Sequence, residues 1–332
     1  MNIAYNRINN SVKNIDLYVN YQCGLRCNHC FIGEHLDSND EIPYNLVKAI
    51  IDKAKQGNVK SITLLGGEPT LHSEIDSIIN YIIESQITLR IVTNGQKPCV
   101  KLIERMSENS LKLVHFCFSI DGANDRVNDS IRGKGTFKRL LNSIELAKSL
   151  NISISGITSI SEQNKHDLFN IIDLCESQSF KYLNIHYVTD RGFAERKVVI
   201  SHQEWSILFD KVKTYKTNIS IRMEKTFVPI DTPIHCEVLK KENIIIDPKG
   251  KVYGCTIFMN FPFAESGVFS SNGFIENTSE MNENKICSCN ETDGCPGISL
   301  TNKELTNSAI KSNLKIDCFF NKTLIETDAD KT

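Results

Sequence analysis

Residues 21–30 read Tyr-Gln-Cys-Gly-Leu-Arg-Cys-Asn-His-Cys and place three thiols, those of Cys23, Cys27 and Cys30, within eight residues. They follow the alternating apolar stretch 15–20, which is typical of a strand. A structural zinc site normally closes with four protein ligands. Three thiolates, in contrast, can hold an iron–sulfur cluster and leave one iron open to a ligand that is not protein. The segment therefore favours a cluster that performs chemistry over a purely structural metal.

Five further strand-like stretches follow, and helical patterns separate them. The expected strands are 59–65, 87–93, 111–120, 152–159 and 182–188. The expected helices are 43–55, 73–84 with Ser73 as its N-cap, 98–108, 137–150, 163–177 and 203–216, and a hairpin is expected over 243–254. Strands that alternate with helices form a parallel sheet, and periodicity alone allows either a doubly wound sheet or a barrel.

In both architectures the active site lies at the C-terminal ends of the strands. The cysteine segment follows the first expected strand, and Gly66-Gly67-Glu68-Pro69 follows the second. Thr93-Asn94-Gly95 follows the third strand, and the stretch from Ser119 to Gly122 ends the fourth. These chemically distinctive segments should therefore meet at one edge of the sheet.

Composition bounds the class of protein. A chain of 332 residues is long enough for one barrel-sized domain and an appendage. The net charge of −2 argues against nucleic acid as a partner. The N-terminal stretch lacks the apolar core of a secretion signal, and no apolar run has the length of a membrane span, so we expect a cytoplasmic protein with no membrane partner.

Twelve cysteines in a reducing compartment should be metal ligands or buried hydrophobes rather than disulfides. Nine of them fall in two groups, at 23–30 and 236–318. The other three, Cys99, Cys117 and Cys175, lie in apolar helix or strand patterns, so we expect them in the core. Any of the three that faced a bound cofactor would matter mechanistically.

The Cys-x3-Cys-x2-Cys segment after the first strand, with Gly-Gly-Glu-Pro after the second, resembles the radical S-adenosylmethionine (SAM) superfamily. The resemblance implies an α/β fold, a partial (β/α)6 TIM-like barrel over residues 15–217. It also implies that Cys23, Cys27 and Cys30 hold a 4Fe-4S cluster whose open iron binds S-adenosyl-L-methionine. Reduction of that cluster would cleave the cofactor to a 5′-deoxyadenosyl radical.

The same resemblance assigns eight cofactor-binding residues: His29, Gly66, Gly67, Glu68, Pro69, Asn94, Ser119 and Arg132. It sets His29 against the adenine and Glu68 at the methionyl ammonium. Ser119 and Arg132 would contact the ribose and the carboxylate, which suits an arginine fork. The structural alternatives are a loop histidine packed on the barrel rim, a plain turn before a helix, a helix cap and a solvated surface charge.

The second cysteine group resembles a SPASM- or twitch-type extension. Its members are Cys236, Cys255, Cys287, Cys289, Cys295 and Cys318. The resemblance implies a small iron–sulfur domain over residues 218–320, after an N-terminal segment 1–14 and before a polar tail 321–332. The last four cysteines match one complete ligand set and the first two match half of another, so we expect one auxiliary cluster and leave a second open. A structural zinc is the alternative.

Such extensions imply radical modification of a ribosomally synthesised peptide by cross-linking, thioether formation, epimerisation or oxidation. The expected partners are the precursor peptide, a reductant such as flavodoxin or ferredoxin, and a separate leader-recognition protein, because the segment before Ile15 is too short for such a domain. The alternatives are a sulfatase-maturase-like protein oxidase, a small-molecule radical SAM dehydrogenase, and a non-enzymatic zinc-binding scaffold. Molybdenum-cofactor cyclisation is disfavoured because the chain lacks a terminal Gly-Gly.

Overall fold

The computed structural model describes residues 12–57, 59–194, 198–232, 242–259, 265, 267–270, 273–276, 307, 309–317 and 322–325. One 12-stranded sheet dominates this part of the chain. Its strands are β1 (Asn14–Asn20), β2 (Ser61–Gly66), β3 (Thr88–Thr93), β4 (Val114–Ser119), β5 (Ser153–Ile160), β6 (Tyr182–Tyr187), β7 (Ser220–Glu224), β9 (Asn243–Ile246), β10 (Lys251–Tyr253), β11 (Gly267–Ser270), β12 (Gly273–Glu276) and β14 (Lys322–Ile325). The strands β8 (Phe227–Pro229) and β13 (Leu314–Ile316) pair separately.

The strand order distinguishes the two architectures that periodicity allowed. The sheet runs β12-β11-β10-β9-β1-β2-β3-β4-β5-β6-β7-β14, and β1 to β7 are all parallel to their neighbours. A doubly wound sheet reverses its order at a switch point, whereas a βα barrel keeps sequence order. The described sheet ends at β12 and β14 rather than closing, so the predicted partial barrel is confirmed.

The six predicted strands correspond to β1 through β6, and the structure adds more. β7 is a seventh parallel strand, and β9 pairs in parallel with the other edge of β1. The predicted hairpin is present as β9 and β10, with Gly250 at φ 80° in its turn. The described C-terminal segments thus continue the barrel sheet, and the predicted division at 217/218 falls between a helix and β7.

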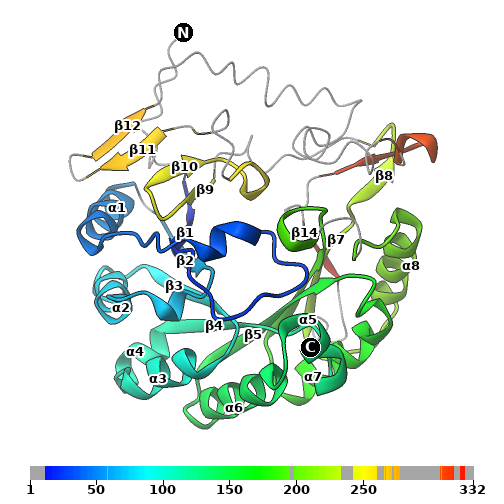
Figure 1. Ribbon diagram of the computed structural model, residues 1–332, viewed down its shortest axis with the longest axis horizontal. Coiled ribbons are helices and arrows are strands. Elements are labelled where there is room, and N and C mark those ends of the chain that lie inside the picture. Colours follow the sequence, from blue (N-terminus) through cyan, green and yellow to red (C-terminus); the bar gives the residue numbers. More distant parts are fainter. Residues whose placement is uncertain are drawn as a thin grey trace.

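Helices cover the outer side of the curved sheet (Figure 1). They are α1 (Tyr44–Gln56), α2 (Ile75–Glu84), α3 (Lys97–Arg105), α4 (Glu108–Leu113), α5 (Asp125–Arg132), α6 (Thr136–Ser149), α7 (Leu168–Ser177) and α8 (His202–Lys213). Short 3-10 turns are η1 (Gly33–Asp37), η2 (Pro69–Leu71), η3 (Lys165–Asp167), η4 (Gly192–Ala194) and η5 (Thr256–Phe258). No helix in the described ranges is both long and apolar enough to cross a bilayer.

Two local expectations were wrong. Residues 111–113 belong to α4 rather than to the fourth strand, because the Ser107 hydroxyl caps that short helix by accepting a bond from the Ser110 amide. Ser73 does not cap α2, which begins at Ile75. Its hydroxyl and amide both donate to Glu41 instead, so the Ser73 hydroxyl bonds a carboxylate that is distant in sequence rather than an amide at the start of α2.

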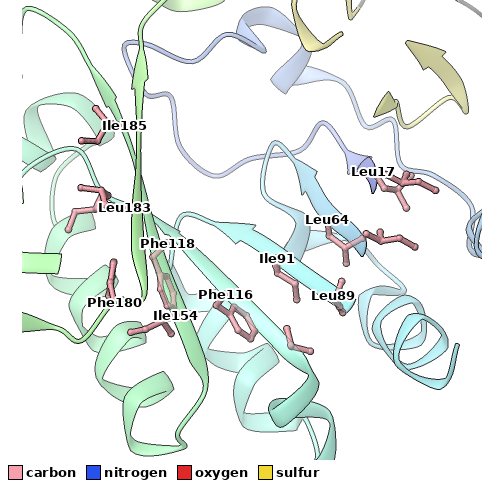
Figure 2. Packing of buried hydrophobic residues seen from close by; sticks show 14 of the residues in the cluster. Leu17, Leu64, Leu89, Ile91, Phe116, Phe118, Ile154, Phe180, Leu183 and Ile185 are labelled. Carbon is pink, nitrogen blue, oxygen red and sulfur yellow. The ribbon is translucent and has the colours of Figure 1, made fainter. Parts of the chain in front are cut away.

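The two faces of the sheet differ in chemistry, as the two-residue period of strands requires. The outer face is apolar and packs beneath the helices, as Figure 2 shows for Leu17, Leu64, Leu89, Ile91, Phe116, Phe118, Ile154, Leu183 and Ile185. The inner face carries polar side chains that border a cavity: Asp16, Thr63, Arg90, Ser119, Ser159, Asn184, His186 and Glu224. A parallel sheet is usually buried by apolar residues on both faces, so the polar inner face indicates a site.

Candidate active site

A cavity of about 440 Å³ lies within the barrel at the C-terminal side of its strands. Seven of the eight predicted cofactor-binding residues and all three motif cysteines border it: Cys23, Cys27, His29, Cys30, Gly66, Gly67, Glu68, Asn94, Ser119 and Arg132. Pro69 does not. It is the buried first residue of η2, where a proline ring fits the start of a helical turn.

The cysteine loop is held in place from two sides. On one side, the Asn28 amide donates to the carbonyl of Ile131 at 3.1 Å, and its side chain donates to the carbonyl of Ser130, which ties the loop to the end of α5. On the other side, the Phe193 amide donates to the carbonyl of Cys30 at 2.9 Å. Gly192 has φ 60°, and a Cβ there would clash with that carbonyl. These contacts fix the cysteine loop between the end of α5 and η4.

All three thiols are half-buried. Burial raises the pKa of Cys23 to about 12 and that of Cys27 to about 11, although the Arg132 charge partly offsets the effect at Cys27. Metal coordination deprotonates a thiol and removes this penalty. No three Cys, His, Asp or Glu side chains in the described chain are arranged around a single metal ion. A cluster needs a wider arrangement, because each thiolate binds a different iron.

Glu68 is a buried carboxylate that no Lys or Arg of the described ranges neutralises. Its Oε1 accepts bonds from the Thr93 hydroxyl at 2.8 Å and from the hydroxyl and amide of Thr70, and its Oε2 accepts the Asn94 amide at 2.8 Å. Burial nevertheless outweighs these bonds and raises the pKa of Glu68. Among the described residues no Lys or Arg side chain pairs with it. An ammonium group from a ligand would complete this site.

The two glycines before Glu68 pack against protein. A Cβ on Gly67 would clash with the carbonyls of Tyr21 and Gln22, and one on Gly66 would meet Asn20 at 2.5 Å. The amides of Gly67 and Glu68 donate to the carbonyls of Asn20 and Gln22. The glycines therefore let the turn after β2 lie directly on the chain between β1 and the cysteines.

Asp121 joins His29 and Arg132 and was missed as a site residue. Its Oδ2 lies 2.5 Å from Arg132 Nε and 3.4 Å from His29 Nε2, and its Oδ1 accepts the Ser159 amide at 2.9 Å. Burial opposes ionisation of Asp121, but Arg132, His29 and that amide outweigh burial and lower its pKa. Burial lowers the pKa of His29, against the pull of Asp121. The signal available in the sequence was an Asp-Gly pair directly after a strand.

Arg132 is thus buried and paired rather than a surface charge, and His29 is not merely packed on the rim. Arg132 uses Nε toward Asp121, and its terminal nitrogens make no hydrogen bond to the described residues. The Nδ1 atom of His29 is buried and has no hydrogen-bond partner among the residues that the structure describes. Both side chains therefore keep hydrogen-bonding capacity on the cavity side for a ligand.

Residues 17–175 match the family model of the radical SAM superfamily. This segment of the chain corresponds to a radical SAM domain. Mycofactocin maturase MftC from Mycolicibacterium smegmatis is 30% identical over 138 residues, which are 42% of this chain and 33% of that protein. The subtilosin biosynthesis protein AlbA from Bacillus subtilis is 22% identical over 244 residues, 72% of this chain and 53% of that protein. The chain therefore spans a third to about half of these curated relatives.

The fold of the radical SAM domain and its continuation resembles that of a solved structure, SuiB from Streptococcus suis bound to S-adenosylmethionine. The TM-score is 0.70 at 17% identity, over 89% of this chain and 76% of that one. SuiB has also been solved with its precursor peptide SuiA, with a TM-score of 0.64 at 18% identity, over 76% of this chain and 61% of that one. At this identity the likeness shows the fold alone.

Of the second cysteine group, the structure describes Cys255 alone. Cys236, Cys287, Cys289, Cys295 and Cys318 lie outside the described residues. Cys255 is buried immediately before η5, whose residues Thr256 and Ile257 border the cavity. Arg191 donates to the carbonyl of Ile257 and so holds this segment at the cavity rim of the radical SAM domain.

The three scattered cysteines differ from one another. Cys99 and Cys175 are buried in the helix-covered core as predicted. Cys117 is buried as predicted, and it lies on the inner face of β4, where it borders the cavity. Phe116 and Phe118, its neighbours along the strand, point outward into the helix-covered core.

Proposed function

We propose that this protein is a radical SAM enzyme that modifies a ribosomally synthesised peptide. The observation that carries the proposal is that one cavity is bordered both by the three motif thiols and by a buried carboxylate that lacks a cation. The names of MftC and AlbA, a maturase and a bacteriocin biosynthesis protein, support a peptide substrate. So does the structure of SuiB with its precursor peptide.

Cys23, Cys27 and Cys30 would hold a 4Fe-4S cluster with S-adenosyl-L-methionine at its open iron. When bound, these groups supply the carbon radical that removes a hydrogen atom from the substrate. The residues present fit both groups, because three half-buried thiols and several unsatisfied polar groups surround the cavity. The protein's share is to hold the cofactor, position the peptide carbon and exclude water.

Glu68 would accept the methionyl ammonium, since a cation offsets the cost of its burial. The terminal nitrogens of Arg132 would meet the carboxylate, with Asp121 keeping the guanidinium in place at 2.5 Å. The orphaned Nδ1 of His29 would find a partner on the adenosine. Asn94 and Ser119 would complete the polar lining beside them.

The division of the chain at 217/218 and the auxiliary clusters are also part of the proposal. Cys287, Cys289, Cys295 and Cys318 would hold one auxiliary cluster, with Cys236 and Cys255 contributing to this or a second one. The position of Cys255 next to η5 at the cavity rim supports a site near the substrate entrance. A reductant of the flavodoxin or ferredoxin type and a leader-recognition protein would act as partners, in the cytoplasm.

The test is release of 5′-deoxyadenosine by anaerobically reconstituted protein supplied with S-adenosyl-L-methionine and dithionite. The wild-type protein should contain iron and release 5′-deoxyadenosine. Cys27→Ala should abolish this release. The control Cys175→Ala, which changes a buried core cysteine, should still release 5′-deoxyadenosine. Protein that contains zinc and no iron, or undiminished release from Cys27→Ala, would refute the proposal. A short peptide encoded beside the gene is the candidate substrate to look for, and it should then show a mass change after turnover.

A further inference from the structure

The cavity has a second polar wall, which none of the roles above uses. It is formed by Asn184 and His186 on β6 and by Glu224 at the end of β7. The two strands are adjacent and parallel, with Ile185 opposite Met223, so the next residues along each strand, His186 and Glu224, stand side by side. This wall belongs to the same cavity as the cysteine loop but to the opposite end of the parallel strand order.

His186 and Glu224 form a close pair. The Nδ1 atom of His186 lies 2.5 Å from Oε1 of Glu224. The glutamate side chain is 1% exposed, whereas that of the histidine is 23% exposed. Both residues border the cavity, and the imidazole is the more exposed member of the pair. No described residue hydrogen-bonds Nε2 of His186, which leaves that atom to the cavity.

A structural ion pair is the simplest alternative, and the surroundings of Glu224 argue against it. Both of its oxygens are buried, and apart from the close approach of His186 Nδ1 to Oε1 neither has a hydrogen-bond partner within the described chain. A structural buried carboxylate is normally saturated with donors, as Asp121 is in the same barrel. The Oδ1 atom of Asn184, on the same wall, is buried and unsatisfied as well. Uncompensated buried groups at a cavity wall indicate a role that involves a ligand.

We propose that His186 is the proton acceptor for the substrate and that Glu224 is its positioning residue; this rests on the proposed function. A carboxylate beside Nδ1 keeps the proton of neutral imidazole on that nitrogen, so the lone pair of Nε2 faces the cavity. An N–H, O–H or S–H group of the peptide, next to the carbon that is modified, gives its proton to Nε2. The bond from hydrogen to the peptide heteroatom breaks and an Nε2–H bond forms.

That step changes no oxidation state. The peptide group keeps the electron pair and becomes an anion, and His186 becomes an imidazolium. The positive charge then lies against the buried carboxylate of Glu224, where the low local dielectric strengthens their attraction. Asn184 is placed to orient the peptide beside the ring, since its unsatisfied oxygen accepts an N–H donor. The cofactor end of the cavity would thus remove a hydrogen atom from the peptide, and the wall with His186 would remove a proton.

The first test uses diethyl pyrocarbonate, which acylates unprotonated imidazole nitrogens, on anaerobically reconstituted protein. Peptide mapping by mass spectrometry should find His186 modified. Glu224→Gln should slow that modification at least about tenfold, because an amide can donate to Nδ1 and force the proton onto Nε2. His166 is exposed on η3 and serves as the internal standard, with the same rate in both proteins. Equal rates at His186 in both proteins would overturn the role of Glu224.

The second test measures the mass-shifted product of the peptide encoded beside the gene, divided by the 5′-deoxyadenosine released in the same reaction. His186→Ala should lower this ratio at least about tenfold, and millimolar imidazole should restore part of it, which a structural role would not allow. His186→Gln is the nearly isosteric second variant, in case the alanine variant fails to fold. An unchanged ratio in either folded variant, or no rescue, would overturn the proposal. Absence of 5′-deoxyadenosine from the wild-type protein would instead refute the proposed function itself.

Discussion

The two ends of the cavity hold their carboxylates in opposite ways. At the cofactor end, Glu68 and Asp121 each accept several hydrogen bonds, and Asp121 also has a bound arginine. At the far wall, Glu224 is equally buried but has only the close contact with His186 within the described chain. Carboxylates whose hydrogen bonds are all made within the protein form a rigid, pre-organised surface, whereas an unsatisfied carboxylate can still accept a hydrogen bond from a ligand. The difference indicates that the cofactor half is built in advance and that the substrate completes the other half.

Asp121→Ala should have the largest effect on stability. It leaves the guanidinium of Arg132 buried without its counter-charge, which costs about 3–5 kcal/mol in comparable pairs. The free energy of unfolding in urea measures the loss. Asp121→Ala with Arg132→Met should recover part of it, since both charges are then gone. A loss below about 1 kcal/mol for the single variant would show that the cofactor end is not rigid in the way we describe.

Glu68→Gln should weaken binding of S-adenosyl-L-methionine about tenfold to a hundredfold, because it replaces a charge-assisted hydrogen bond with a neutral one. Calorimetry on reconstituted protein measures the affinity. The control is Glu162→Gln, at an exposed glutamate on the surface. Unchanged affinity in Glu68→Gln would contradict the proposal that Glu68 binds the methionyl ammonium.

His115 makes stability depend on pH. Its ring is bonded to the hydroxyls of Ser153 and Ser155, and burial, with nearby Arg90, lowers its pKa to about 4 from the usual 6.5. Between pH about 6.5 and about 4, His115 is therefore protonated in the unfolded chain but not in the native chain. The free energy of unfolding falls as the pH drops through this range. Because the ring is partly exposed, we expect about 1–2 kcal/mol. The melting temperature of His115→Gln should vary less across this window than that of the wild type, and equal slopes would contradict the assignment.

Glu224→Gln should change stability least, by less than about 1 kcal/mol in either direction, because glutamine can still hydrogen-bond Nδ1 of His186 and the charge of the carboxylate is costly to bury. Urea unfolding of this variant beside Asp121→Ala compares the two ends of the cavity directly. A loss above about 2 kcal/mol would mean that Glu224 is a structural anchor, like Asp121.

Periodicity predicted the elements, and the motifs predicted most of the cavity lining. The six βα repeats and the convergence of the cysteines, Glu68 and Asn94 followed from strand ends meeting at one edge. The order of the strands in the sheet could not be predicted from periodicity. Pairings such as β9 with β1 depend on contacts between segments more than 200 residues apart in the sequence. The family resemblance predicted that Arg132 binds the cofactor. Its pairing with Asp121 is a tertiary contact, which no local sequence pattern predicts.

The far wall was missed for a related reason. Tyr182, Asn184 and His186 alternate with apolar residues, a pattern that ordinarily indicates a solvent-exposed face. Only the closure of β6 and β7 around the cavity turns that face inward. The inward position of Cys117 was not predicted for the same reason, since alternation fixes which residues share a face but not which face meets the helices.

The central claim is that one cavity brings the cofactor and a peptide carbon together. It is tested most directly by producing the peptide encoded beside the gene in deuterated form and analysing the 5′-deoxyadenosine that reconstituted enzyme releases with it. Our account predicts that the released 5′-deoxyadenosine carries deuterium from the peptide. Peptide modification accompanied only by unlabelled 5′-deoxyadenosine would contradict it.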